Sequence, residues 1–223
     1  MDKVTKARQR IRDIGIRRSV FYYIFVIVER VFGLHVHYVF SANSFLDDAK
    51  VEVPEGYEHR LLEPADLIPY VADTAELSEE FLRGAQARQD ICAATFLKGK
   101  VVSFGFRTLK RAPVTKQLDV VVPTGFRYSY KAWTHPDHRG KHLSRSRAKL
   151  SRSSQYPSLS YIKVNNYPSL LNPYRFPTSR RLRMGYVGWW EFAGKQYPFA
   201  TRRAKWIGFE FVKKDEVVNR RYI

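Results

Sequence analysis

Two neighbouring apolar stretches constrain the fold of this chain most strongly. Residues 91–97 and 101–109 are rich in β-branched and aromatic side chains, and Lys98-Gly99-Lys100 separates them. Strand-like stretches that flank a short glycine-containing turn are typical of a β-hairpin. The sequence therefore predicts an antiparallel sheet that contains this pair of strands.

Helices and further strands are predicted on both sides of the hairpin. A strand over 58–63 precedes it, Pro64 opens one helix, and Ser78 can cap another that runs to about Gln89. A third helix is predicted from Leu143. Strands are also predicted over 120–122, 126–134, 161–164, 187–193 and 206–212. This order of elements is typical of an α+β or α/β fold with a mixed sheet.

Length and composition agree with a folded protein. The 223 residues suit one domain of ordinary size with room for an additional N-terminal element. A hydrophobic fraction of 44% supplies a core and excludes a globally disordered chain. Cys92 is the only cysteine, which excludes an intramolecular disulfide and a zinc site made of clustered cysteines. This cysteine content is compatible with the cytoplasm, where we expect the protein to reside.

The positive charge of the chain is unevenly distributed. The net charge is +18, yet residues 47–90 hold 12 acids and four bases, whereas the sequence from Arg127 onward holds 21 bases and five acids. Such a surplus favours an anionic partner for the C-terminal half. The partner could be a phosphorylated coenzyme, RNA, an anionic membrane surface or an acidic acceptor, and a merely solvated basic face is the remaining alternative.

The N-terminus combines basic and apolar residues. Seven lysines and arginines lie in the first 18 residues, and the uninterrupted apolar run Val20–Val28 follows. Nine residues are too few to cross a bilayer, which takes about 20. The apolar positions from Phe21 to Phe32 recur at helical spacing, and Gly33 can end the helix. This helix either packs on the domain or lies at the inner face of a membrane as a peripheral anchor.

Residues 34–40 alternate as a strand would, with His35 and His37 on one side. A histidine pair at this spacing could bind a metal, but no third ligand stands nearby in the sequence. We therefore expect two polar side chains on the solvated face of a strand, and no metal site.

The segment from Lys131 to Ser144 carries the strongest chemical signal. A strand ends near Pro136, a basic turn follows, and a helix begins near Leu143. Such a turn directs backbone N–H groups and the positive end of a helix dipole to one point, which suits a phosphate. Gly140 allows close approach of the backbone, and the adjacent Arg139 and Lys141 add positive charge.

This segment resembles the coenzyme-binding motif of the GNAT acyltransferases, in which an apolar strand leads through V-x-P to R-G-x-G-x-G/A at the start of a helix. Thr134-His135-Pro136 corresponds to V-x-P, and Arg139-Gly140-Lys141 to the start of the phosphate turn. His142 stands where the family usually has its second glycine, and Ser144 occupies the position of a small residue.

A second similarity lies further along the chain. Tyr161 to Ser169 resembles the later strand of the family with its N-x-x-S/A sequence, which places Asn166 and Ser169. Met184-Gly185-Tyr186 resembles the start of the next strand. The tyrosine that often protonates the leaving thiolate in this family is replaced by Arg181, and Tyr174 is the nearest substitute.

The resemblance implies a central, largely antiparallel sheet flanked by helices over residues 57–223, with residues 1–56 as a basic N-terminal extension. It implies direct transfer of an acetyl or other acyl group from coenzyme A to an amine, without a metal. The strand over 126–134 would diverge from the next one and hold the coenzyme arm with its free backbone groups. The implied coenzyme-binding residues are Trp133, Thr134, Arg139, Gly140, Lys141, His142, Leu143, Ser144, Asn166 and Ser169, and Tyr174 is the implied acid.

Other functions remain open at this point. On a helix from Leu143, the bases Arg145, Lys149 and Arg152 share the face opposite Leu143 and Leu150. Nine aromatic residues between 156 and 192 alternate with cations, a mixture that also suits RNA. An enzyme at a membrane surface that acts on a lipid-linked sugar, and an inactive sensor of acyl-coenzyme A, are further alternatives.

Overall fold

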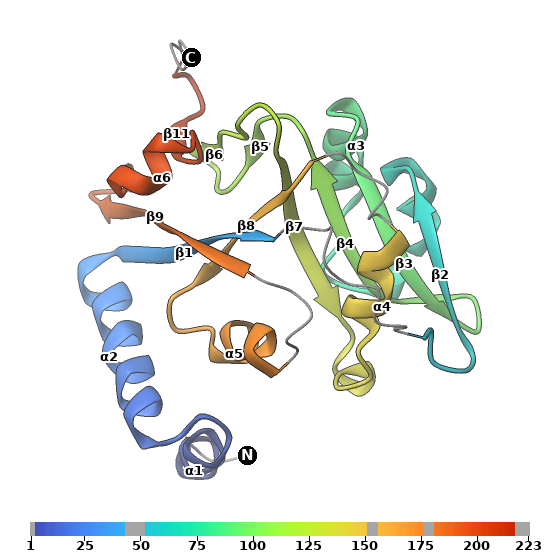
Figure 1. The fold of residues 1–223 in the computed structure, drawn as a ribbon, viewed down its shortest axis with the longest axis horizontal. Helices are drawn as coiled ribbons and strands as arrows, with labels where there is room; N and C mark the ends of the chain where they lie inside the picture. The colour runs from blue at the N-terminus through green and yellow to red at the C-terminus, as the bar shows by residue number, and fades with distance from the viewer. Residues whose placement is uncertain (1–2, 43–51, 151–155, 176–180, 217–223) are drawn as a thin grey trace. The chain divides into compact units, whose positions relative to one another are not determined.

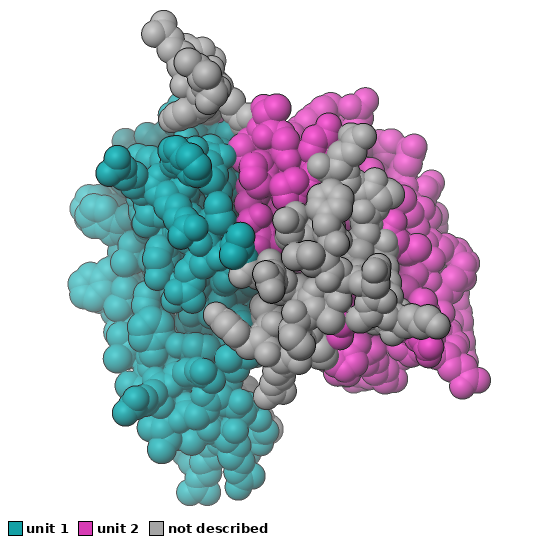
Figure 2. Space-filling view, in the orientation of Figure 1, with its two compact units in different colours: residues 1–40, 113–121, 161–223 teal, residues 41–112, 122–160 magenta. Residues whose placement is uncertain are grey.

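The computed structural model describes residues 3–42, 52–150, 156–175 and 181–216. The chain forms two compact units that each draw on separate stretches of sequence (Figure 2). Unit 1 comprises residues 1–40, 113–121 and 161–223, and unit 2 comprises residues 41–112 and 122–160. The predicted division into an extension over 1–56 and a domain over 57–223 stays a prediction.

Unit 2 is built on a sheet whose strands lie side by side in the order β2-β3-β4-β7, with the first residues of β8 beyond β7 (Figure 1). Neighbours from β2 to β7 are antiparallel, and β7 and β8 are parallel. The strands are β2 (Tyr57–Leu62), β3 (Ile91–Leu97), β4 (Lys100–Thr108), β7 (Arg127–Thr134) and β8 (Ser158–Lys163). The predicted mixed and largely antiparallel sheet is confirmed.

The predicted hairpin is the joint between β3 and β4. Lys98 and Gly99 form its turn with φ angles of 49° and 79°. Both values lie in the left-handed region that tight hairpin turns require and that glycine adopts without strain. The turn chemistry in the sequence therefore fixes the register of these strands.

Helical segments flank the sheet of unit 2 and close its core. They are η2 (Pro64–Asp73), α3 (Glu79–Ala87), η3 (Pro136–His138) and α4 (Leu143–Leu150), where η marks a 3₁₀ helix. Ser78 caps α3 as predicted, because its side chain accepts a hydrogen bond from the Phe81 N–H at 3.2 Å. Leu67 and Leu82 from these helices join Phe104 and Phe106 of the sheet in one cluster of buried side chains.

Unit 1 contains two long N-terminal helices and most of the C-terminal strands. Strands β10, β9 and β1 are neighbours, and β9 and β10 form an antiparallel hairpin. The larger elements are α1 (Lys3–Ile14), α2 (Ile16–Phe32), β1 (Leu34–Ala42), α5 (Tyr167–Arg175), β9 (Arg181–Phe192) and β10 (Lys195–Ala200). A small sheet has the order β11-β6-β5, from β5 (Ala112–Pro113), β6 (Leu118–Val120) and β11 (Phe211–Lys213).

The strand predicted over 206–212 is wrong for most of its length. Residues Arg202–Trp206 form the helix α6, and β11 begins only at Phe211. Gly208 between them has a φ of 75°, a left-handed conformation that a regular strand does not contain. The apolar residues that suggested one strand therefore belong to a helix end, a turn and a short strand.

The predicted end of α2 at Gly33 is confirmed. Gly33 has a φ of 62°, and its N–H donates to the Glu29 carbonyl at 2.9 Å, as at many helix C-termini. A Cβ at this position would lie 2.3 Å from the Glu191 carbonyl oxygen. Glycine is thus required both for the backbone angle and for the close approach of β9. No helix among the described residues is long and apolar enough to span a membrane.

The prediction that His35 and His37 lie on a solvated face is wrong. His37 is buried, and both imidazoles stack on the Trp189 ring, with centroids 4.5 Å away for His35 and 5.3 Å for His37. His35 Nδ1 also lies 3.0 Å from the Glu29 carboxylate. The two histidines are packing residues, and the described residues include no group of three or more histidine, cysteine, aspartate or glutamate side chains placed to hold a metal.

Candidate functional site

The predicted strand, turn and helix follow one another in unit 2. Strand β7 ends at Thr134, η3 forms the first half of the turn, and α4 begins at Leu143. His135 Nδ1 accepts a hydrogen bond from the Asp137 N–H at 3.3 Å, which caps η3. Arg139 Nε donates to the Thr134 carbonyl at 3.2 Å. This bond holds the guanidinium of Arg139 close to the turn.

Two residues of the turn have a left-handed backbone. The φ angle is 81° at Gly140 and 58° at His142. These are the positions at which the GNAT-like motif has glycines, so the conformation explains the preference for glycine there. His142 adopts it although it carries a Cβ, at a strain of about 1–2 kcal/mol. A Cβ at Gly140 would meet nothing within 4 Å, so the space beside this backbone is open.

The first turn of α4 offers backbone donors. The Arg145 and Ser146 N–H groups already donate to the His142 carbonyl, at 2.9 Å and 3.1 Å. The N–H groups of Leu143 and Ser144 precede them and have no acceptor within the helix. Leu143 is buried and anchors the helix, whereas Ser144 is exposed. Together with the helix dipole, this arrangement suits an anion such as phosphate.

Lys141 and His138 share one partner on β2. Lys141 Nζ donates to the Tyr57 hydroxyl at 2.9 Å, and the same hydroxyl lies 2.9 Å from His138 Nδ1. The side chain of Tyr57 thus joins both arms of the turn to the sheet. The sequence gives no sign of this role for Tyr57, because Tyr57 lies more than 80 positions from both Lys141 and His138.

A second chain of polar contacts fastens α4 to the sheet. Ser146 Oγ lies 2.6 Å from His59 Nε2, and His59 Nδ1 lies 2.9 Å from Thr95 Oγ1. Ser146 and Thr95 are buried. Burial, followed by the nearby charge of Arg147, lowers the pKa of His59. These contacts hold the helix that would present the phosphate donors.

The buried face of α4 differs from the one expected. Leu143, Ser146 and Arg147 are buried, whereas Leu150 is exposed. Leu150, which the sequence places on the same side of the helix as Leu143, is therefore not part of the core. Arg147 donates a hydrogen bond to Ser103 Oγ, and the lack of a side chain at Gly105 leaves room for its guanidinium. The side chain of Lys149 and the whole of Arg152 lie outside the described residues.

Strand β7 contains a bulge beside Arg147. Phe104 pairs with Trp133 and Phe106 with Tyr130, so the single residue between them on β4 faces two residues on β7. Lys131, one of these two, has a φ of 47°. A bulge of this kind re-aims side chains and interrupts the ladder of backbone hydrogen bonds. Its position brings irregular backbone close to the predicted coenzyme residues Trp133 and Thr134.

The contacts of Trp133 and Thr134 support this end of β7. Ser103 Oγ donates to the Trp133 carbonyl at 2.8 Å and lies 2.9 Å from Thr134 Oγ1. The Trp133 ring stacks on Phe104, with centroids 5.3 Å apart. Both residues are partly exposed and accessible.

The parallel pairing of β7 with β8 is short. Only Arg127 and Tyr128 pair, with Ser158 and Leu159, although β7 has eight residues. The Ser129 and Ser158 hydroxyls, 2.5 Å apart, follow this ladder. The short register agrees with the expectation that this strand diverges from the next one.

An acid reaches β7 from another element. The Tyr130 hydroxyl donates to Asp90 Oδ2 at 2.5 Å and accepts from Arg88 Nη2 at 3.0 Å, while Arg88 Nε donates to the same carboxylate at 3.1 Å. Asp90 is buried, and its Oδ1 has no hydrogen-bond partner among the described residues. Burial, with the carboxylate beside it, raises the pKa of Tyr130. No acidic residue belongs to β7 itself, and the contact with Asp90 could not be predicted because Asp90 and Tyr130 are 40 positions apart.

The remaining predicted residues lie in unit 1. Asn166 Oδ1 accepts a hydrogen bond from the Ser169 N–H at 3.4 Å, which caps the start of α5. The backbone of Tyr174 belongs to α5, but its side chain lies outside what the structure describes. The eight predicted coenzyme-binding residues that lie between positions 133 and 144 are thus together in unit 2. The binding roles of these eight, and of Asn166 and Ser169, stay predictions.

No protein-family model and no curated protein matches the chain. Several solved structures that match are GNAT acetyltransferases, the family that the sequence resembles. One is from Colwellia psychrerythraea, with 14% identity and a TM-score of 0.45 over 71% of this chain and 56% of that one. A putative acetyltransferase from Novosphingobium aromaticivorans has 10% identity and a TM-score of 0.45, over 70% and 62%.

Glucosamine-6-phosphate N-acetyltransferase from Arabidopsis thaliana also matches, with 14% identity and a TM-score of 0.36 over 53% of this chain and 90% of that one. The first matching structures are longer proteins, of which this chain covers between 52% and 65%.

Proposed function

We propose that this protein transfers an acyl group, most simply acetyl, from coenzyme A to an amine acceptor. The observation that carries the proposal is the turn between β7 and α4, with left-handed residues at Gly140 and His142 and the free donors of a helix N-terminus after them. The coenzyme thioester supplies the activated acyl group. The residues around the turn would bind and orient it.

The turn fits a pyrophosphate. The backbone N–H groups of Leu143 and Ser144 would donate to phosphate oxygens, and the open space beside Gly140 leaves room for them. Arg139 and Lys141 would neutralise part of the charge, since both are exposed and close to the turn. We extend the proposal to Asn166 and Ser169 as further coenzyme contacts, on the resemblance alone.

The bulged end of β7 would receive the reactive part of the coenzyme. A backbone N–H near Trp133 or Thr134 would polarise the thioester carbonyl and stabilise the oxyanion that forms on attack. The support for this role is the interrupted ladder at Lys131 and the short pairing with β8.

The acceptor amine must lose a proton in order to attack. We propose that Tyr130 and Asp90 perform this task as a relay. The Tyr130 hydroxyl would accept the amine's proton while its own proton passes to the buried Asp90 carboxylate, to which it is already hydrogen-bonded. Tyr174 remains our candidate for protonating the leaving thiolate. We also propose that the reaction takes place in the cytoplasm.

The test starts with binding. Calorimetric titration of the full chain with coenzyme A should give a saturable signal at micromolar to millimolar concentrations, and a pool of amines incubated with acetyl-coenzyme A should yield acylated products in mass spectrometry. Tyr130→Phe should lower the turnover rate while coenzyme affinity stays unchanged. Absence of coenzyme binding at millimolar concentration would overturn the proposal.

A further inference from the structure

The outward face of α2 is apolar along its whole length. Its exposed fractions run from 39% at Tyr23 to 67% at Ile16, and even Val31 in the last turn is 65% exposed. The positions recur every three or four residues, so they form one stripe on the helix. The members of this stripe are Ile16, Val20, Tyr23, Ile24, Ile27 and Val31.

The opposite face of α2 packs within unit 1. Ser19 is buried and donates to the Gly15 carbonyl at 2.9 Å, and Phe25 and Val28 are half-buried. Near the end of the helix, Glu29 accepts from Lys163 Nζ at 2.5 Å and pairs with His35. One face of α2 therefore holds the helix to unit 1, and the apolar stripe on the opposite face is available for another partner.

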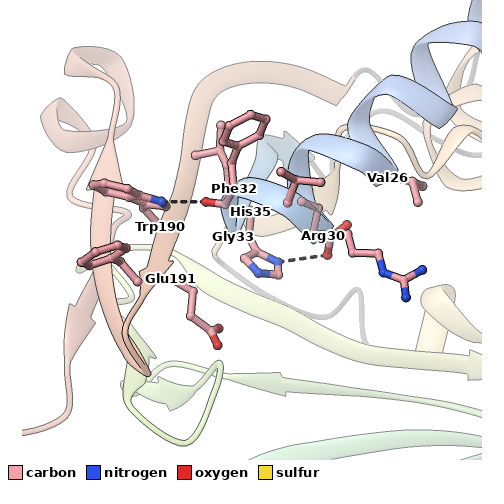
Figure 3. A pocket seen from close by; sticks show the side chains of 11 residues that line it. Val26, Arg30, Phe32, Gly33, His35, Trp190 and Glu191 are labelled. Atoms are coloured by element: carbon pink, nitrogen blue, oxygen red, sulfur yellow. Dashed lines mark hydrogen bonds and ion pairs between the residues drawn. The ribbon is translucent and has the colours of Figure 1, made fainter.

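Exposed aromatic side chains of β9 lie next to the end of α2, in a hollow that Arg30 and Glu191 also line. The end of the helix and β9 line an open hollow of about 1040 Å³. Figure 3 shows the Trp190 indole at its edge, where Nε1 donates to the Phe32 carbonyl at 2.6 Å. Phe32 and Phe192 also line the hollow and are largely exposed. Trp190 pairs with the exposed Tyr197 of β10 across the hairpin.

Basic side chains border the stripe. Arg10 places its guanidinium 3.7 Å from the centre of the Tyr22 ring, which joins α1 to α2. The acids on the described part of these two helices are Asp13, which bonds to Gln9, and Glu29, which faces unit 1. One further acid, the exposed Glu191 of β9, lines the hollow and accepts a hydrogen bond from Gln196 Nε2 at 3.1 Å. The exposed cations are Arg8, Arg12, Arg17, Arg18 and Arg30.

We propose that α1, the stripe of α2 and the aromatic side chains of β9 and β10 form a surface that binds an anionic lipid bilayer. Apolar side chains would enter the boundary between headgroups and acyl chains, while the arginines contact lipid phosphates. Tryptophan and tyrosine are enriched at this depth of a membrane. The proposal does not depend on acyl transfer.

Charge complementarity selects this partner over two others. An RNA would contact the arginines but would leave the aliphatic stripe in water. A second copy of the chain would cover the stripe but would bring two sets of like-charged arginines together, which is unfavourable. An anionic bilayer satisfies both features at once.

The test is flotation of the full chain with vesicles in a density gradient. We expect binding to vesicles of 70% phosphatidylcholine and 30% phosphatidylglycerol, at least tenfold weaker binding to pure phosphatidylcholine, and release of much of the protein by 0.5 M NaCl, because salt screens surface charge. Absence of flotation with the anionic vesicles at low salt would overturn the proposal.

Matched variants locate the surface. Ile24→Asp with Ile27→Asp should reduce binding at least tenfold, and both positions are exposed, so the fold is retained. Leu109→Asp, an equally exposed apolar position in unit 2, should bind like the wild type. Equal flotation of the double variant and the wild type would show that the stripe is not the membrane surface.

A spectroscopic readout addresses the aromatic part. Vesicles with brominated acyl chains should quench the tryptophan fluorescence of the wild type, and Trp190→Phe should lose a measurable part of this quenching. If the wild type instead forms dimers that the double aspartate variant abolishes, without binding vesicles, then the surface is a self-association interface and the lipid proposal is wrong.

Discussion

The guanidinium of Arg147 donates a hydrogen bond to the hydroxyl of Ser103 in the interior of unit 2. Arg147 is buried, and none of the described acidic side chains forms an ion pair with it. The neighbouring Cys92 remains a neutral thiol, because burial raises its pKa to about 12. Burial lowers the pKa of Arg147 itself to about 10. A charged group thus occupies the core beside the β7 bulge, where it bonds to Ser103 and has no acidic partner among the described residues.

We expect Arg147→Met to keep or raise the free energy of unfolding, by on the order of 1 kcal/mol. Methionine has a similar length and removes the desolvation of a charge, and replacing buried charges with apolar residues is often neutral or stabilising. Urea denaturation at pH 7 measures the change. Arg83→Met, at an exposed position, should stay within about 0.5 kcal/mol of the wild type. If Arg147→Met lost more than about 2 kcal/mol of unfolding free energy while Arg83→Met did not, this account would be contradicted.

Gly140→Asp should weaken coenzyme A binding at least tenfold, about 1.4 kcal/mol. The new carboxylate would lie beside the proposed pyrophosphate and repel it. Calorimetric titration measures the change in affinity.

Gly125→Asp is the matched control for this substitution. Gly125 has a φ of 80°, nearly that of Gly140, and a Cβ there also meets nothing within 4 Å. Both variants therefore carry the same backbone strain and the same charge, but Gly125 precedes β7 and lies outside the turn. Unchanged affinity in a folded Gly140→Asp variant would show that the turn does not hold the coenzyme.

Local signals in the sequence predicted the parts of the fold that neighbours along the chain determine. The hairpin at Lys98 and Gly99, the cap at Ser78 and the stop of α2 at Gly33 each depend on residues within one turn. The path from β7 to Leu143 was predictable for the same reason, because glycine and cations mark it in the sequence.

Contacts between distant segments could not be predicted in this way. His37 is polar and was expected in solvent, but Trp189, some 150 residues further on, provides a ring for it to stack on. Asp90 and Tyr130 come together only because α3 ends near the strand that carries the tyrosine. The burial of Arg147 depends on the space at Gly105. The spacing of residues along the sequence does not indicate which of them meet in the folded chain.

Gly33→Ala should destabilise unit 1 by about 3 kcal/mol, the sum of backbone strain and a steric clash. The new Cβ would lie 2.3 Å from the Glu191 carbonyl oxygen, which belongs to the backbone and cannot turn away. Gly194→Ala has a similar left-handed φ of 72° but meets nothing within 4 Å, so it should lose only about 1 kcal/mol through backbone strain. Thermal denaturation of both variants separates the steric clash from the backbone strain. Equal losses of stability in the two variants would show that β9 does not approach Gly33 so closely.

The buried His37 should make the protein sensitive to acid. Desolvation, followed by the nearby charges of Lys163 and His35, lowers the pKa of His37 from 6.5 to about 3, although a hydrogen bond with the Val187 backbone acts in the other direction. Its Nδ1 has no hydrogen-bond partner among the described residues. Below pH 6.5 His37 is protonated in the unfolded chain, whereas in the folded chain it stays neutral down to about pH 3. Stability contributed by this residue is therefore complete above pH 6.5 and falls as the pH is lowered.

His37→Phe should remove this dependence. Phenylalanine can keep the stack on Trp189 and the edge contacts with Tyr161 and Phe211, and it has no proton to bind. Urea denaturation at pH 7, 5 and 4 should show the wild type losing up to about 3 kcal/mol more than the variant over this range, since each pKa unit corresponds to about 1.4 kcal/mol. Other groups titrate equally in both proteins, so the difference between them isolates His37. Parallel pH profiles for the two proteins would mean that His37 takes up its proton in the folded state, and hence that its ring reaches water.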